Sequence, residues 1–148
     1  MNTKPLSILL ADDDEDDRLF FKDALEECRV KTMVETVNDG IELMNLLLEE
    51  STVLPHILFL DLNMPRKNGI ECLEDIRKSD RLKHITVAIY STSGAERDIE
   101  DTFVKGANVY IKKPNDFNAL KEVLENVLST KWQFHTSGLN KDTFLLNV

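Results

Sequence analysis

Residues 57–61 read Ile-Leu-Phe-Leu-Asp, a continuous apolar run that ends in a carboxylate. Such a run is typical of a β-strand that is covered on both faces, because a half-exposed strand alternates apolar and polar residues. A charged residue at the end of a buried strand is seldom placed there for solubility alone. Asp61 is therefore the first candidate for a functional residue.

Strand-like runs and helical patterns alternate along the chain on both sides of this stretch. Further strands are predicted at residues 6–11, 33–37, 87–90 and 109–111, and helices at residues 15–28, 41–50, 70–76, 99–106 and 120–128. Five βα units predict an α/β fold with a parallel sheet between two layers of helices. Right-handed crossovers leave few topologies, and the doubly wound strand order 2-1-3-4-5 is the common one for five strands.

Composition and charge narrow the function classes. The 148 residues fit one domain, and 42% of them are hydrophobic, which is enough for a buried core. A net charge of −9 disfavours binding to nucleic acid or to anionic membranes. The sequence contains no apolar stretch long enough for a membrane span or a signal peptide, and Cys28 and Cys72 form no CxxC motif. We therefore expect a reduced, cytoplasmic protein.

The periodic pattern stops after about residue 130. We expect a domain over residues 1–130 and a tail over residues 131–148 that is too short for a second domain. The tail contains Trp132, Phe134 and the run Phe144-Leu145-Leu146. A packed or disordered terminus is the favoured interpretation of the tail, and an arm that holds a dimer together is the alternative.

Polar residues gather where the predicted strands end. Asp12 and Asp13 follow the strand at residues 6–11, Ser91-Thr92-Ser93 end the fourth strand, and Lys112-Lys113-Pro114 end the fifth. Because the carboxyl ends of parallel strands share one edge of the sheet, Asp12, Asp13 and Asp61 should converge. Three carboxylates repel one another, and Mg²⁺ with its preference for oxygen ligands would relieve that repulsion.

An aspartate in such a site can attack phosphorus, with a cation and a hydroxyl donor stabilising the charge that develops. Each part also has a simpler explanation. The acidic run at residues 12–17 could only cap a helix, the serines could only form a loop, and the lysine pair could only be solvated. A functional site is favoured because these simpler explanations would all have to hold at four successive strand ends.

These stretches together resemble the receiver domain of two-component response regulators, a CheY-like family with a flavodoxin-like fold. The matching motifs are Ile8-Leu9-Leu10-Ala11-Asp12-Asp13-Asp14, Leu60-Asp61-Leu62-Asn63-Met64-Pro65, Asn68-Gly69, Ser91-Thr92-Ser93, Gly106-Ala107-Asn108 and Lys113-Pro114. They occur in the family's order and span roughly residues 6–130. The family's commoner threonine is replaced by Ser91, and no output domain follows within this sequence.

The resemblance implies a stand-alone receiver that takes a phosphoryl group on Asp61 from a histidine kinase or a histidine phosphotransfer protein. It implies that Asp12, Asp13, Asp61 and the backbone carbonyl of Asn63 hold Mg²⁺. Lys113 would bridge Asp61 and the phosphate, with a cis bond to Pro114.

The resemblance also implies how such a protein signals. Ser91 and Tyr110 would form the switch, and Asn63 and Ser93 would tune the lifetime of the phosphate. Gly69 is expected to adopt a positive φ beside the site. Signalling would run through the face built by the fourth helix, the fifth strand and the fifth helix, which binds a downstream protein or forms a homodimer.

Three other functions compete with this one. An Mg²⁺-dependent phosphatase with an aspartate nucleophile would want a second acid two residues after the nucleophile, where this chain has Asn63. A phosphate-independent interaction module would usually lack one of the three carboxylates. A flavin-binding protein is disfavoured because the acidic run after the first strand would repel a phosphate. We expect a signalling module that turns over no metabolite and is therefore not an enzyme in the ordinary sense.

Overall fold

A single parallel sheet organises the computed structural model, which describes residues 4–129 and 144–146. Its strands are β1 (Leu6–Ala11), β2 (Thr32–Val37), β3 (Ile57–Leu60), β4 (Thr86–Ser91), β5 (Val109–Lys112) and β6 (Leu145–Leu146). They lie in the order β2-β1-β3-β4-β5-β6. The predicted order 2-1-3-4-5 is confirmed, and β6 extends it by a strand that the sequence pattern did not predict.

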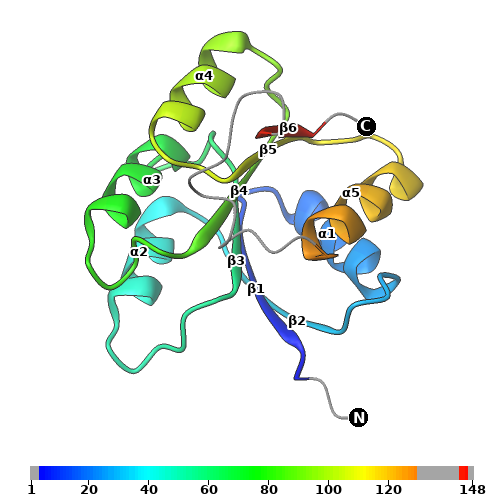
Figure 1. Ribbon diagram of the computed structural model, residues 1–148, viewed down its shortest axis with the longest axis horizontal. Helices are drawn as coiled ribbons and strands as arrows, with labels where there is room; N and C mark the ends of the chain where they lie inside the picture. Colours follow the sequence, from blue (N-terminus) through cyan, green and yellow to red (C-terminus); the bar gives the residue numbers. More distant parts are fainter. Residues whose placement is uncertain (1–3, 130–143, 147–148) are drawn as a thin grey trace.

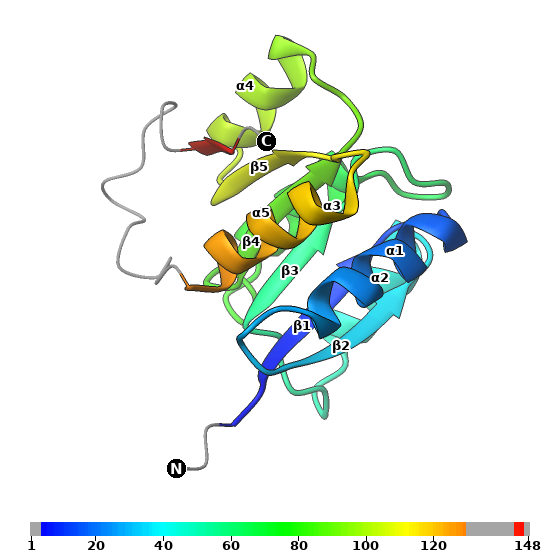
Figure 2. The same ribbon diagram turned by 90° about the vertical axis from the view of Figure 1, so that its right-hand side faces the viewer.

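Helices cover both faces of this sheet. One layer contains α1 (Glu15–Glu26) and α5 (Phe117–Ser129), and the other contains α2 (Gly40–Leu48), α3 (Gly69–Lys78) and α4 (Glu96–Val104) (Figures 1 and 2). Each layer packs its own apolar cluster against the sheet. The central strand β3 is buried along its whole length, which explains why its sequence is apolar at every position.

Side-chain caps fix where three of the helices begin. Asp14 accepts a hydrogen bond from the amide of Asp17 at the start of α1, and Asp39 caps α2 in the same way. Asn68 and Glu71 form a reciprocal capping box at the start of α3. Part of the acidic run after β1 therefore does cap a helix, as the simpler explanation held.

Two glycines differ in why the fold needs them. The prediction of a positive φ at Gly69 is wrong, because the positive-φ residues within the described ranges are Arg66 and Gly106. Gly69 instead begins α3 so close to the preceding loop that a Cβ atom would clash with the carbonyl oxygen of Asp61. Gly106, with a φ of 98°, ends the α4 region as expected for a helix stop signal.

The described part of the tail packs on the edge strand of the five-strand sheet. Leu145 and Leu146 pair in parallel with Tyr110 and Ile111 of β5. Phe144 is fully buried, with its ring centroid 5.2 Å from that of Phe103 on α4 and 6.2 Å from that of Tyr110. This segment thus belongs to the same core as α4. Trp132, Phe134 and the predicted boundary near residue 130 lie outside the described residues.

Both cysteines are free thiols. Burial raises the pKa of Cys28 to about 11 and that of Cys72 to about 12, so neither thiol has the character of a reactive nucleophile at neutral pH. None of the helices formed by the described residues has the length and the apolar character that crossing a membrane requires.

Candidate functional site

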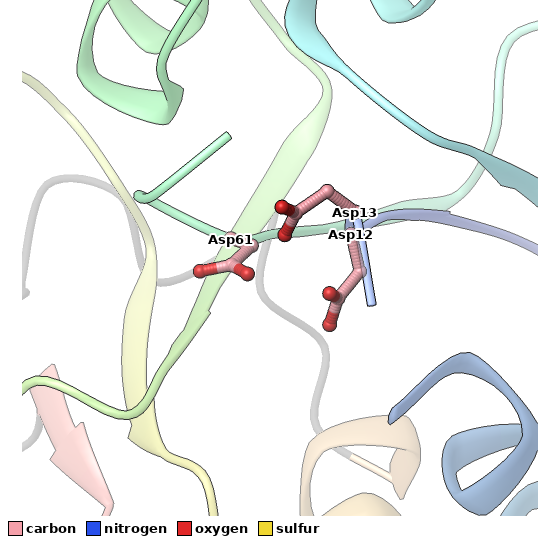
Figure 3. Close-up of side chains that lie close together, drawn as sticks. All are labelled: Asp12, Asp13 and Asp61. Carbon is pink, nitrogen blue, oxygen red and sulfur yellow. The ribbon is translucent and has the colours of Figure 1, made fainter. Parts of the chain in front are cut away.

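The carboxyl ends of β1 and β3 bring three aspartates together. Ala11 pairs with Leu60 in the parallel register of these strands, so the residues that follow, Asp12 and Asp61, come side by side. Together with Asp13 they bring three carboxylate oxygens, one from each aspartate, within 4.8 Å of one another (Figure 3). The predicted convergence of the three carboxylates is confirmed.

The three aspartates differ in exposure. Asp12 is fully buried and Asp61 nearly so, whereas Asp13 is exposed. Backbone amides hold the two buried carboxylates in place: Asp14 donates to Asp12 over 3.0 Å, and Asn63 donates to Asp61 over 3.3 Å. Solvent can therefore reach the site on the side of Asp13, but not on the side of Asp12.

A lysine that directly follows β5 enters this cluster. The Nζ atom of Lys113 lies 2.8 Å from Asp12, 2.8 Å from Asp17 and 3.3 Å from Asp61. Its backbone amide donates to the carbonyl of Ser91 over 2.7 Å, which continues the pairing of β4 and β5 and directs the side chain inward. Of the two candidate lysines, the structure brings Lys113 to the carboxylates and leaves Lys112 exposed.

One detail of this loop corrects the sequence-based expectation. The described residues contain no cis peptide bond, so the predicted cis bond between Lys113 and Pro114 is wrong. The trans isomer is the intrinsically preferred one even before proline. It still delivers the ammonium group to the carboxylates, because the position of Lys113 is set by its hydrogen bond to Ser91.

Asp17 is the site residue that sequence reasoning missed. It lies in the first turn of α1, five residues after Asp12, where an acid is expected at any helix N-terminus. Its contact with Lys113 spans 96 residues of sequence. No spacing rule distinguishes Asp17 from its acidic neighbours, so only the packing of α1 against the end of β5 identifies it.

The charges of the cluster perturb one another. The pKa of Asp61 is raised from 3.8 to about 6, mainly by burial and also by the charge of Asp12, while Lys113 opposes both effects. Burial alone would lower the pKa of Lys113, but its hydrogen bonds to Asp12 and Asp17 and the charge of Asp61 raise it overall. Lys113 is therefore a fixed cation, whereas Asp61 retains affinity for a proton or another positive charge.

The donor set suits a hard divalent cation. Three carboxylates at this spacing offer oxygen ligands and excess negative charge, and the exposed Asp13 leaves room for water or for an anionic oxygen. A bound cation would favour the charged form of Asp61 and so oppose the rise in its pKa. The cluster could thus hold a metal ion of the Mg²⁺ class.

The loop between β4 and α4 links the remaining candidates through Ser93. The amide of Ser93 donates to the buried hydroxyl of Ser91 over 3.1 Å. Its carbonyl accepts a 2.8 Å hydrogen bond from the hydroxyl of the buried Tyr110, and its own hydroxyl donates to Asp98 over 2.6 Å. The structure therefore connects Ser91 and Tyr110 through one shared residue. Asn63, in contrast, is exposed at the rim of the cluster.

Comparisons with known proteins agree with this geometry. The family described as "Response regulator receiver domain" matches residues 8–125. The chain is 30% identical to the chemotaxis protein CheY1 of Helicobacter pylori, over 84% of this chain and 98% of that protein.

Two solved structures also match the fold. The phosphorylated cyanobacterial phytochrome response regulator RcpA has a TM-score of 0.77 and 33% identity, covering 84% of this chain and 91% of that one. The Mn²⁺-bound form of response regulator Rcp1 has a TM-score of 0.76 and 26% identity, covering 92% and 98%.

Proposed function

Because this chain belongs to the response regulator receiver domain family, we propose that it is a phosphorylation switch with Asp61 as its phosphoacceptor. In this proposal a histidine kinase or a histidine phosphotransfer protein supplies the phosphoryl group, and Mg²⁺ is required. The protein changes conformation when it is phosphorylated and turns over no metabolite.

The observation that carries the proposal is the arrangement around Asp61. Its carboxylate is nearly buried beside Asp12 and Asp13, and the ammonium of Lys113 lies 3.3 Å away. A carboxylate that could attack phosphorus, a set of oxygens suited to a metal ion and a fixed cation thus support the proposal from within one cluster. An acid that serves only to solvate the surface would need none of these neighbours.

The chemistry follows from these groups. A carboxylate oxygen of Asp61 forms the new P–O bond, while the P–N bond of the phosphohistidine breaks and its electron pair stays on the imidazole. Lys113 stabilises the negative charge of the transferred oxygens. A bound Mg²⁺ would supply Lewis-acid stabilisation of the same charge, held by Asp12, Asp13, Asp61 and the carbonyl of Asn63.

Signalling in this proposal uses Ser91 and Tyr110. The hydroxyl of Ser91 turns toward the phosphoryl group and gives up the hydrogen bond that it accepts from the amide of Ser93. Because Tyr110 donates to the carbonyl of the same Ser93, movement of this loop changes the position of the tyrosine. The switch is a shift between two populated conformations. Asn63 and Ser93 then tune how long the phosphate persists.

The downstream partner in this proposal binds the surface of α4, β5 and α5, and a homodimer through the same surface is the alternative. That surface contains β6, because Leu145 pairs with Tyr110 of β5 and Phe144 packs on Phe103 of α4. A partner would therefore meet the tail segment that packs beside the buried Tyr110.

The proposal is tested by incubating the protein with Mg²⁺ and phosphoramidate and then measuring the intact mass. We expect the gain of one phosphoryl group, its loss in Asp61→Asn, and its absence when EDTA replaces Mg²⁺. Asp80→Asn removes one fully exposed carboxylate and serves as the control that still reacts. A phosphoryl group on another residue, or steady hydrolysis of a phosphomonoester, would overturn the proposal.

A further inference from the structure

Lys113 has no hydrogen-bond donor to spare. An ammonium group carries three N–H donors, and three carboxylates surround this one: Asp12 at 2.8 Å, Asp17 at 2.8 Å and Asp61 at 3.3 Å. The ring of Tyr90 lies on another side, with its centroid 5.2 Å from Nζ. Any further oxygen that binds Lys113 must therefore replace one of its present partners.

The three carboxylates are not equally replaceable. Asp12 is fully buried, so water cannot replace the ammonium as its partner. Asp61 is the group that carries the incoming oxygens in the proposed reaction, and its side chain is only 8% exposed. Asp17 is 38% exposed, so water can replace the ammonium as its partner. Asp17 is thus the partner that Lys113 can release most easily.

We propose that Asp17 is a positioning residue that competes with the phosphoryl group for the ammonium of Lys113. This inference rests on the proposed function of Asp61 and adds a residue to it. Before phosphorylation, Asp17 holds Lys113 on the α1 side of the cluster. When the phosphoryl oxygens arrive, one N–H group of Lys113 donates its hydrogen bond to them instead of to Asp17. The Asp17 carboxylate then turns to solvent. Asp17 therefore weakens the binding of the phosphoryl group.

Local structure keeps Asp17 available for this competition. Its backbone amide donates to the N-capping side chain of Asp14, which fixes the first turn of α1 irrespective of where the Asp17 carboxylate points. Arg18 donates to the backbone carbonyl of Asp12 over 2.8 Å and joins the same turn to the end of β1. The side chain of Asp17 can thus leave Lys113 while the helix stays in place.

The test uses beryllium fluoride, a mimic of the phosphoryl group, with saturating Mg²⁺ and titration calorimetry. We expect Asp17→Asn to bind it about twofold to fivefold more tightly than the wild type, the range set by a partly exposed ion pair. The matched control is Asp16→Asn, which removes the same charge from the same helical turn. Because Asp16 is not among the partners of Lys113, this variant should not tighten binding to the same extent. Asp17→Glu should restore the wild-type affinity.

A double-mutant cycle separates competition for Lys113 from a general effect of charge. In a Lys113→Met background, Asp17→Asn should no longer tighten binding, because the shared cation is gone. Equal effects of Asp16→Asn and Asp17→Asn, or an unchanged effect of Asp17→Asn in the Lys113→Met background, would overturn the inference. A wild-type protein that binds no beryllium fluoride would instead overturn the proposed function of Asp61.

Discussion

Replacing the Asp61 carboxylate by an amide should stabilise the folded protein when no divalent cation is bound. Burial raises the pKa of Asp61 from 3.8 to about 6 in the folded chain, so the fold favours the neutral form of this side chain. Asparagine reproduces the shape of that neutral form. The charged cluster thus lowers the free energy of unfolding at neutral pH, and Asp61→Asn should remove that loss.

The size and the pH dependence of the effect follow from linkage. The pKa of Asp61 is about two units higher in the folded chain than in the unfolded one. At about 1.4 kcal/mol per unit, this difference lowers the free energy of unfolding by roughly 3 kcal/mol at pH 7.5. Because the folded pKa is raised, the stability contributed by protonated Asp61 is complete below about pH 4 and is lost as pH rises through 6. The advantage of Asp61→Asn should therefore grow from a few tenths of a kcal/mol at pH 4 to its full value above pH 7.

Urea unfolding of the wild type and Asp61→Asn in EDTA, at several pH values between 4 and 7.5, measures this difference. Asp80→Asn, which removes a side chain that is 99% exposed, is the control and should change stability little at any pH. Mg²⁺ at ten times its dissociation constant should then stabilise the wild type by about 1.4 kcal/mol and the variant by less. A variant that is no more stable than the wild type at pH 7.5 would refute the reasoning.

Three further substitutions test other parts of the structure by the same unfolding measurement. Gly69→Ala should cost about 1–3 kcal/mol because its Cβ atom would clash with the carbonyl of Asp61, whereas Gly94→Ala, which meets only the flexible end of a lysine, should cost less than half as much. Arg77→Lys should cost about 2 kcal/mol or more, because the guanidinium donates to three backbone carbonyls and a side-chain amide that one ammonium cannot serve together; a loss below about 0.5 kcal/mol would contradict this. Phe144→Ala should cost up to about 3 kcal/mol, since the ring is fully buried, and a neutral result would show that the tail segment contributes nothing to the fold.

The sequence predicted best those parts of the fold that depend on uniform burial. The strand at residues 57–60 was located to the residue because apolar side chains face a helix layer on both sides. Helix ends were less certain, and α1 stops at Glu26, before Cys28, although the apolar stripe continues to that residue. The hydrophobic period reports which face is buried, whereas the final turn depends on local hydrogen bonds.

The sequence pattern did not predict features that depend on contacts between residues far apart in the sequence. The short apolar run at residues 144–146 has no period of its own, and its strand exists because Phe144 fits between α4 and β5. The position of Asp17 beside Lys113 depends in the same way on how α1 packs against the end of β5. The three aspartates were predictable because parallel strands place their carboxyl ends at one edge whatever the details of packing.

The two-residue strand β6 also affects how the sheet meets other chains. A bare β5 edge would present the backbone groups of Val109, Tyr110 and Ile111, an apolar stretch suited to accept a strand from a neighbouring molecule. Leu145 and Leu146 pair with that edge from within the chain. The tail segment therefore protects the sheet from edge-to-edge aggregation. A protein truncated before residue 144 should aggregate more readily at high concentration.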